Sequence, residues 1–165
     1  MKNLLPLLFI LSVTACQYPA GLKEIKTDRF AIKVTGYMDA TEKLHPEADF
    51  QYENRYRTVY LLVLDTVKTP GMTLDSFGRQ ALATLATGSV RKVKWNRIDS
   101  VTSLNGVPAR QYEQVMYLTG EDVYFDLVAV EAKDRFYQVL GWTIMRRKDK
   151  YAKDINDMVT SFRLL

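Results

Sequence analysis

The stretch Tyr56–Val67, with the sequence YRTVYLLVLDTV, decides the fold of this chain. Successive side chains of a strand point to opposite faces, and here both faces are apolar. The two sets are Val59, Leu61 and Val63 on one face and Tyr60, Leu62 and Leu64 on the other. A strand buried on both faces is typical of a sheet that is covered from both sides. The run therefore favours a three-layer architecture over a sheet with one face in water.

Two shorter strands are predicted upstream of this run. Apolar residues alternate with polar or small ones over Phe30–Thr35, which is the pattern of a half-buried strand, and Gly36-Tyr37 ends it. A polar stretch through His45-Pro46-Glu47 predicts a loop. The segment Asp49–Asn54 then predicts a short strand.

A helix is expected directly after the long strand. Thr69-Pro70-Gly71 breaks the extended chain, Thr73 can cap a helix that begins at Leu74, and Gly88 is placed to end it. The apolar residues of this segment recur at helical spacing, and they are Leu74, Phe77, Ala81, Leu82 and Leu85.

From Ser89 onward the sequence predicts strands joined by tight turns. Asn105-Gly106 is a strong hairpin signal, because a type I′ turn needs positive φ at both central residues. It separates the predicted strands Val101–Leu104 and Val107–Tyr117. Two further turns, at Thr119–Asp122 and Lys133–Arg135, lead into strands over Val123–Ala132 and Phe136–Thr143.

The chain closes with an amphipathic helix. Its apolar stripe recurs at helical spacing and consists of Tyr151, Ile155, Met158, Val159 and Phe162. We expect this stripe to pack on the sheet. Together, these elements predict an α+β fold in which an antiparallel sheet of about six strands lies between helical layers.

Three motifs stand out within this order of elements: LNGVPARQYE at Leu104–Glu113, YQVLGWT at Tyr137–Thr143, and Ser161-Phe162-Arg163. With them, the chain resembles the PsbP-like fold, an α/β/α sandwich. Photosystem II extrinsic proteins, a eukaryotic Ran-binding import factor and bacterial envelope lipoproteins of the DcrB type share this fold. The resemblance does not fix the strand register over residues 29–56, where the family often has a proline and a tryptophan after the first strand. These motifs indicate a fold and not an activity.

The N-terminal segment has the parts of an export signal. Lys2 supplies a positive charge, and Leu4–Val13 is a ten-residue apolar run. That run is too short for the roughly 20 residues that span a bilayer as a helix. Val13-Thr14-Ala15-Cys16 resembles the lipobox of bacterial lipoproteins, which is cleaved between Ala15 and Cys16 and lipidated on the cysteine. The alternative is an ordinary secretory signal with a chance cysteine.

The lipobox resemblance implies three regions and a location. They are a signal peptide over residues 1–15, a lipidated tether over residues 16–28 and the PsbP-like domain over residues 29–165. Acyl chains on Cys16 would anchor the mature chain in a lipid bilayer. Gln17 stands where many inner-membrane lipoproteins have aspartate, which favours the periplasmic side of the outer membrane.

Composition narrows the class of protein. Cys16 is the only cysteine, so no disulfide can form once it is acylated. Aromatic residues make up 12% of the chain, which argues against disorder. The formal net charge of +4 is small for a protein that binds nucleic acid, and no such partner is expected.

No pattern of residues indicates an enzyme, a cofactor or a metal site. His45 is the only histidine, and Pro46 next to it works against the helical spacing of metal ligands. The carboxylates that cluster in sequence are Glu121, Asp122, Asp126, Glu131 and Asp134. Asp126 and Glu131 differ in parity and would point to opposite faces of one strand. We interpret these carboxylates as solvated.

The most basic segment contains Arg91, Lys92, Lys94 and Arg97, and Arg146-Arg147-Lys148 precedes the last helix. Lys92 and Lys94 would share one face of a strand, with apolar residues on the other. The simpler interpretation is a solvated or edge-guarding strand face. The second interpretation is a surface patch that binds an anionic envelope partner, such as lipid headgroups, polysaccharide or an acidic protein surface.

The leading hypothesis is a membrane-anchored, non-enzymatic binding or assembly module of the bacterial cell envelope, with an envelope protein as its partner. The alternative is a carrier that holds a small apolar ligand between sheet and helix, with Trp95, Trp142 and tyrosines as lining. Aromatic residues at such positions are more often simply core. A hydrolase ranks third.

Overall fold

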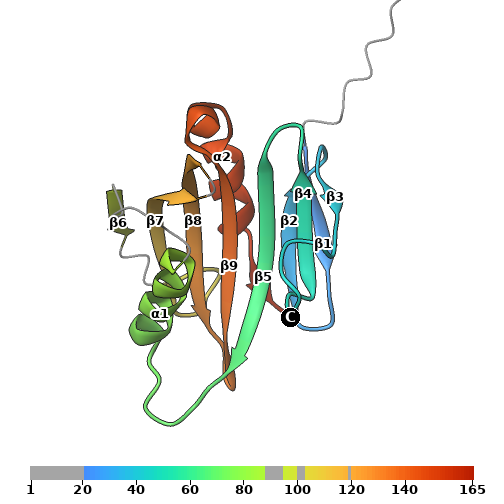
Figure 1. Ribbon diagram of the computed structural model, residues 1–165. Coiled ribbons are helices and arrows are strands. Elements are labelled where there is room, and N and C mark those ends of the chain that lie inside the picture. Colours follow the sequence, from blue (N-terminus) through green and yellow to red (C-terminus); the bar gives the residue numbers. More distant parts are fainter. Residues whose placement is uncertain (1–20, 88–94, 100–102, 119) are drawn as a thin grey trace, which may run out of the picture.

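The computed structural model describes residues 21–87, 95–99, 103–118 and 120–165, and of residues 95–99 only the backbone. Its main body is a seven-stranded antiparallel sheet in the order β3-β4-β5-β9-β8-β7-β6 (Figure 1). The strands of this sheet are β3 (Asp39–Ala40), β4 (Phe50–Asn54), β5 (Val59–Val67), β6 (Trp95–Asp99), β7 (Ala109–Leu118), β8 (Glu121–Glu131) and β9 (Arg135–Ile144).

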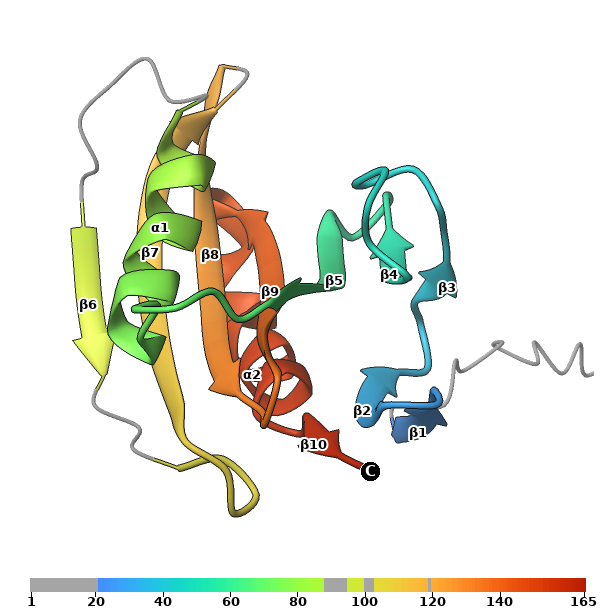
Figure 2. The same ribbon diagram turned by 90° about the horizontal axis from the view of Figure 1, so that it is seen from below.

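Helical layers cover both faces of the large sheet. Helix α1 (Leu74–Ala86) lies on one face, while α2 (Lys148–Val159) lies on the other, preceded by the short 3₁₀ helix η1 (Met145–Arg147) (Figure 2). A second sheet, in the order β1-β2-β10, shares the face of α2. Its strands are β1 (Leu22–Lys26), β2 (Phe30–Thr35) and β10 (Arg163–Leu164). The predicted α+β sandwich is confirmed, with this small sheet as an additional part of one layer.

Strand β5 is buried on both faces at its centre, as predicted. Leu61 and Val63 belong to the core under α2, whereas Leu62 belongs to the core under α1. All three are less than 5% exposed, with values of 0%, 3% and 4%. Pairing with β4 on one side and β9 on the other makes β5 an interior strand of the large sheet.

Helix α1 begins where the sequence predicted. The hydroxyl of Thr73 accepts a hydrogen bond from the Ser76 amide at 3.1 Å, and the Ser76 hydroxyl accepts one from the Thr73 amide at 2.9 Å. This reciprocal capping satisfies two amides at the start of the helix. Phe77 on the buried side stacks on Phe136 of β9, with ring centroids 5.0 Å apart. The helix ends at Ala86, and Gly88 lies outside the described residues.

The Asn105-Gly106 turn is confirmed, with φ of 49° and 89° at the two residues. Leu104 and Val107 pair beside the turn, while residues 101–102 of the predicted first strand lie outside the described residues. Strand β7 begins at Ala109 and pairs with β6, the strand before the turn, in a register that places Asp99 opposite Gln111. Asn105 also donates a hydrogen bond to the Phe162 carbonyl at 2.6 Å, which ties the turn to the segment after α2.

The N-terminal part of the domain requires two corrections. The predicted tether over residues 16–28 is wrong from Leu22 onward, because β1 pairs along its whole length with β2. Four of the five side chains of β1 are exposed, so backbone hydrogen bonds define this strand and its sequence shows little apolar pattern. In β2, Ala31 and Thr35 are buried although a half-buried strand was predicted, since β2 is the central strand of its sheet.

Helix α2 packs on the sheet through its predicted stripe. Tyr151, Ile155, Met158 and Val159 are at most 4% exposed, and Phe162 beyond the helix is fully buried. The chain then adds β10 to the small sheet, which the sequence did not predict. No helix within the described ranges combines the length and apolar character that a membrane crossing requires.

Helix α2 approaches the sheet closely at Gly141 of β9. A Cβ atom at this glycine would lie 2.6 Å from Cγ2 of Ile155 and 3.2 Å from Cγ1 of Val159. Non-bonded heavy atoms from other residues essentially never come within 3.0 Å of a real Cβ atom. The missing side chain at position 141 therefore sets the distance between α2 and the sheet.

We predict that Gly141→Ala lowers the free energy of unfolding by about 1–3 kcal/mol, because the added methyl overpacks a stiff β-branched neighbour. Gly21→Ala is the control, since nothing lies within 4 Å of that Cβ position. Denaturant unfolding measures both. In a double-mutant cycle with Ile155→Ala, the combined loss should be smaller than the sum of the single losses. An unchanged stability of Gly141→Ala would contradict this packing.

Candidate functional site

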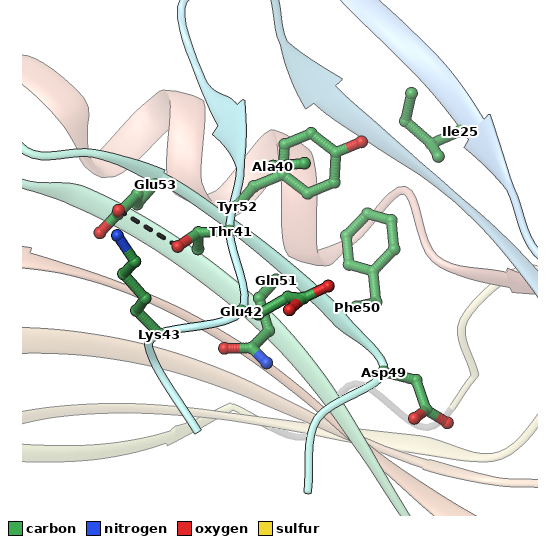
Figure 3. Close-up of a pocket in the computed structure, with 10 residues that line it drawn as sticks. All are labelled: Ile25, Ala40, Thr41, Glu42, Lys43, Asp49, Phe50, Gln51, Tyr52 and Glu53. Carbon is green, nitrogen blue, oxygen red and sulfur yellow. Dashed lines mark hydrogen bonds between the residues drawn. The ribbon is translucent and has the colours of Figure 1, made fainter. Parts of the chain in front are cut away.

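A cleft of about 600 Å³ opens between the small sheet and the β3–β4 edge of the large sheet (Figure 3). Strand β1 contributes one lining residue, and the segments on either side of the 44–48 loop contribute the rest. The lining residues are Ile25, Ala40, Thr41, Glu42, Lys43, Asp49, Phe50, Gln51, Tyr52 and Glu53.

The floor of the cleft is aromatic. The rings of Phe50 and Tyr52 lie side by side, with centroids 4.9 Å apart, because alternate residues of β4 point to the same face. Phe50 also packs edge-on against Phe30 of the small sheet at 5.7 Å. Tyr52 and Ile25 are half-buried, so part of this apolar surface remains accessible.

One buried side chain holds the loop beside the cleft. The carboxamide oxygen of Gln51 accepts hydrogen bonds from the amides of Leu44 at 2.8 Å and His45 at 2.9 Å. Its nitrogen donates to the carbonyls of His45 at 2.8 Å and Ala48 at 2.7 Å. The predicted loop is therefore confirmed and is fastened to β4. His45 itself caps this loop, since its Nδ1 accepts from the Glu47 amide at 3.2 Å.

Charged residues of both signs form the rim, and several are ion-paired. Arg29 contacts Asp49 at 3.0 Å and Asp65 at 3.1 Å, and Asp65 also binds Arg135. At the other end of the cleft, the Thr41 hydroxyl donates to Glu53 at 3.2 Å, as Figure 3 shows. Arg29 thus connects the small sheet to the rim and to β5.

The cleft combines an apolar floor with charged groups at its rim. Within the described part of the chain, no group of three histidine, cysteine or acidic side chains could hold a metal ion. Protein interfaces commonly have this arrangement, an apolar core surrounded by a polar rim. A volume of about 600 Å³ also falls within the range of ligand sites.

The other predicted site residues lie elsewhere or outside the described residues. Ala15 and Cys16 precede the first described residue, and Arg91, Lys92 and Lys94 fall in the gap before β6. Arg97 lies in β6, with its backbone opposite that of Glu113. The basic patch therefore remains a prediction.

Asp126 corrects the prediction that the clustered carboxylates are solvated, because its side chain is fully buried. Its Oδ1 accepts a hydrogen bond from Gln111 at 2.8 Å, and the same Gln111 nitrogen contacts Oδ1 of Asn156 in α2 at 3.0 Å. Buried charges need such partners. Glu131, by contrast, is half-buried and binds Lys68 at 2.7 Å.

Some of the residues proposed to line an apolar ligand site contact one another instead. Trp142 stacks on Tyr60 at 5.1 Å and on Phe125 at 6.2 Å. A cavity beside α1, lined by residues such as Phe77 and Gln138, measures about 150 Å³. The geometry therefore favours the open cleft over an enclosed space between sheet and helix.

We predict that Asp65→Asn lowers the free energy of unfolding by about 1–3 kcal/mol, because it leaves two partly buried guanidinium groups without their shared carboxylate. The side chain of Asp65 is 20% exposed, whereas that of Asp49 is 77% exposed. Asp49→Asn is therefore the control and should change stability by less than about 0.5 kcal/mol. Equal losses in the two variants, measured by denaturant unfolding, would refute the different roles assigned to them.

Comparison with known proteins identifies the fold. No family model matches the chain, and no curated protein sequence matches it. The solution structure of cyanobacterial PsbP (CyanoP) from Synechocystis has a TM-score of 0.62 at 11% identity, covering 93% of this chain and 99% of that one.

Two further solved structures have similar folds. The crystal structure of LpqN, involved in cell envelope biogenesis of Mycobacterium tuberculosis, has a TM-score of 0.55 at 9% identity and covers 87% of this chain and 90% of that one. A protein from Bacteroides thetaiotaomicron has a TM-score of 0.54 at 8% identity over 82% of this chain and 45% of that one. The chain therefore has the PsbP-like fold that the sequence predicted.

Proposed function

We propose that this protein is a lipid-anchored, non-enzymatic binding or assembly module of the bacterial cell envelope. Residues 1–15 would be removed as a signal peptide, and Cys16 would carry the lipid. The cleft beside β4 would receive an envelope protein partner. Gln17 favours the periplasmic side of the outer membrane as the location.

The sequence of the N-terminal segment supports the anchor. Val13-Thr14-Ala15-Cys16 has the order of a lipobox, and the apolar run before it is too short to span a bilayer as a helix. Strand β1 begins at Leu22, six residues after Cys16 in the sequence. Two or three acyl chains suffice for stable anchoring, whereas a single chain gives only marginal binding.

The observation that carries the binding role is the Phe50–Tyr52 pair on the floor of a charged cleft. Aromatic anchors in a pocket, surrounded by a polar rim, often dominate the energetics of protein interfaces. The rim has both signs of charge, which suits a protein segment better than a uniformly charged polymer. We assign the cleft to a partner segment that places an apolar side chain on these rings.

The basic segment with Arg91, Lys92, Lys94 and Arg97 is a second proposed contact, for an anionic envelope partner. It lies in the sequence directly before and within β6, which forms an edge of the large sheet. The β3–β4 edge beside the cleft is at the opposite side of that sheet. The two proposed contacts could therefore be made at the same time.

We predict that Cys16→Ser abolishes acylation, so the chain either accumulates unprocessed or leaves the membrane fraction. Cell fractionation with immunoblotting, after a wash in high salt, distinguishes the bound and released forms. Gln17→Asn is the control and should leave processing unchanged. A Cys16→Ser protein that is cleaved and still membrane-bound would contradict the proposed anchor.

We also predict that a photo-crosslinking amino acid at Tyr52 captures a defined envelope protein in living cells. The same group at Val67, which is 62% exposed at the far end of β5, serves as the control. The Tyr52 adduct, identified by mass spectrometry, should weaken when Lys43→Glu alters the rim. Identical adducts from both positions, or none from Tyr52, would count against the cleft as a partner site.

A further inference from the structure

The first described residues, at the start of β1, lie at one particular end of the sheet. The carbonyl of Gly21 accepts a hydrogen bond from the Gly36 amide at 3.1 Å, which places the start of β1 beside the end of β2. The Tyr37 carbonyl accepts from Asn54 at 2.5 Å, and the guanidinium of Arg57 lies 4.5 Å from the Tyr37 ring centre. The start of β1 is thus next to the β4–β5 turn.

The start of α2 lies at the same end. Arg147 donates a hydrogen bond to the carbonyl of Tyr56 at 2.7 Å, which joins η1 to the β4–β5 turn. Arg146 pairs with Glu121 at the beginning of β8 at 3.3 Å. Figure 1 shows the β4–β5 turn, η1 and the beginning of β8 together at the upper end of the sheet. We call the surface formed by Tyr56, Arg57, Met145 and Arg147 the tether face.

Two large apolar side chains protrude from the tether face. Tyr56 is 87% exposed, and Met145 is 40% exposed. Tyrosine has an apolar ring with a polar tip, which suits the boundary between lipid headgroups and acyl chains. Neither side chain contributes to a core of the domain.

Basic residues surround these apolar groups. Residues 53–57, 121–122 and 146–150 contain six basic and four acidic side chains, a net charge of +2. Glu53 and Glu121 are paired with Arg55 and Arg146, at 3.0 Å and 3.3 Å. Among the described carboxylates, none forms an ion pair with Arg57 or Arg147. Arg57 lies over the Tyr37 ring and Arg147 donates to the Tyr56 carbonyl, so each positive charge is held at this face without a described carboxylate to neutralise it.

The number of residues between Cys16 and the start of β1 limits how far this face can be from a membrane. Five peptide links separate Cys16 from Gly21. Fully extended, they span at most about 18 Å. A chain acylated at Cys16 therefore keeps the start of β1, and the tether face next to it, close to the headgroups.

We propose that the tether face rests on the membrane surface, with Tyr56 and Met145 at the level of the headgroups and Arg57 and Arg147 against anionic lipid. This inference rests on the proposed anchor at Cys16. Docking by this face would give the domain a fixed orientation, so that its long strands stand away from the bilayer. A juxtamembrane basic residue contributes roughly 1 kcal/mol of attraction to an anionic leaflet.

Hydrogen exchange of the membrane-bound protein tests the orientation. The full chain, purified from membranes, is reconstituted into vesicles of phosphatidylcholine alone or of phosphatidylcholine and phosphatidylglycerol in equal parts. Amide exchange over residues 55–58 and 145–148 should be several-fold slower on the anionic vesicles. Exchange over residues 66–71 and 132–135, at the opposite end of the sheet, is expected to be the same on both.

Paired variants test the chemistry. The double variant Arg57→Gln/Arg147→Gln loses roughly 1 kcal/mol of attraction for each arginine, so its docking to the anionic vesicles should be about thirtyfold weaker. The slower exchange over residues 55–58 and 145–148 should then disappear. The control double variant Lys26→Gln/Lys133→Gln removes the same total charge outside the tether face and should retain the slower exchange. The proposal is overturned by equal slowing at both ends, by no slowing at either, or by the same loss in both double variants.

Retention of the protein on the vesicles after a high-salt wash tests the acyl anchor separately from docking by the tether face. If the protein is washed off at high salt, the acyl anchor is refuted. The chain is then coupled through Cys16, its only cysteine, to a maleimide lipid, and the exchange pattern is measured again. Slowing confined to residues 55–58 and 145–148 supports docking by the tether face in that case too, whereas uniform exchange overturns it.

Discussion

The contact between α2 and the centre of the sheet is the constraint on which the rest of the structure depends. Gly141 leaves room for Ile155, so the helix lies directly on β9. On its other side, α2 contacts β2, and the Tyr37 hydroxyl donates to Asp154 at 2.7 Å. Burial and that hydrogen bond raise the pKa of Tyr37, which remains a neutral donor. The helix thereby positions the small sheet, and the cleft opens between that sheet and β4.

Much of the fold could be predicted from the sequence, because its periodicity is strong where burial is one-sided or complete. Strand β5, the stripe of α2 and the Thr73 cap depend on local pattern and were predicted correctly. Strands β1 and β10 were missed, because they are mostly exposed or very short and depend on backbone pairing with β2. The turn before β7 was predicted from Asn105-Gly106, but the bounds of the strand before it were not, because β6 ends at Asp99 and only the Leu104–Val107 bridge is described between β6 and the turn.

The candidate site could be predicted only in part. The loop around His45 and the strand after it were predicted, but Phe50 and Tyr52 became a site only through the approach of Ile25 from another sheet. Gln51 holds the 44–48 loop through hydrogen bonds to two backbone amides and two carbonyls, and its position in the sequence does not reveal these partners. Asp126 was predicted to be solvated because the sequence does not show that α2 covers it, with Gln111 and Asn156 as neighbours.

The fold alone does not determine the function, since CyanoP and LpqN share it at 11% and 9% identity. The proposed envelope role therefore depends on Cys16, and the intact mass of the protein extracted from the envelope tests it most directly. We predict a chain of residues 16–165 with a diacylglyceryl group on Cys16, with or without an amide-linked acyl chain. A mature chain that begins at another residue, or one with a free thiol at Cys16, would contradict the lipid anchor and the function proposed from it.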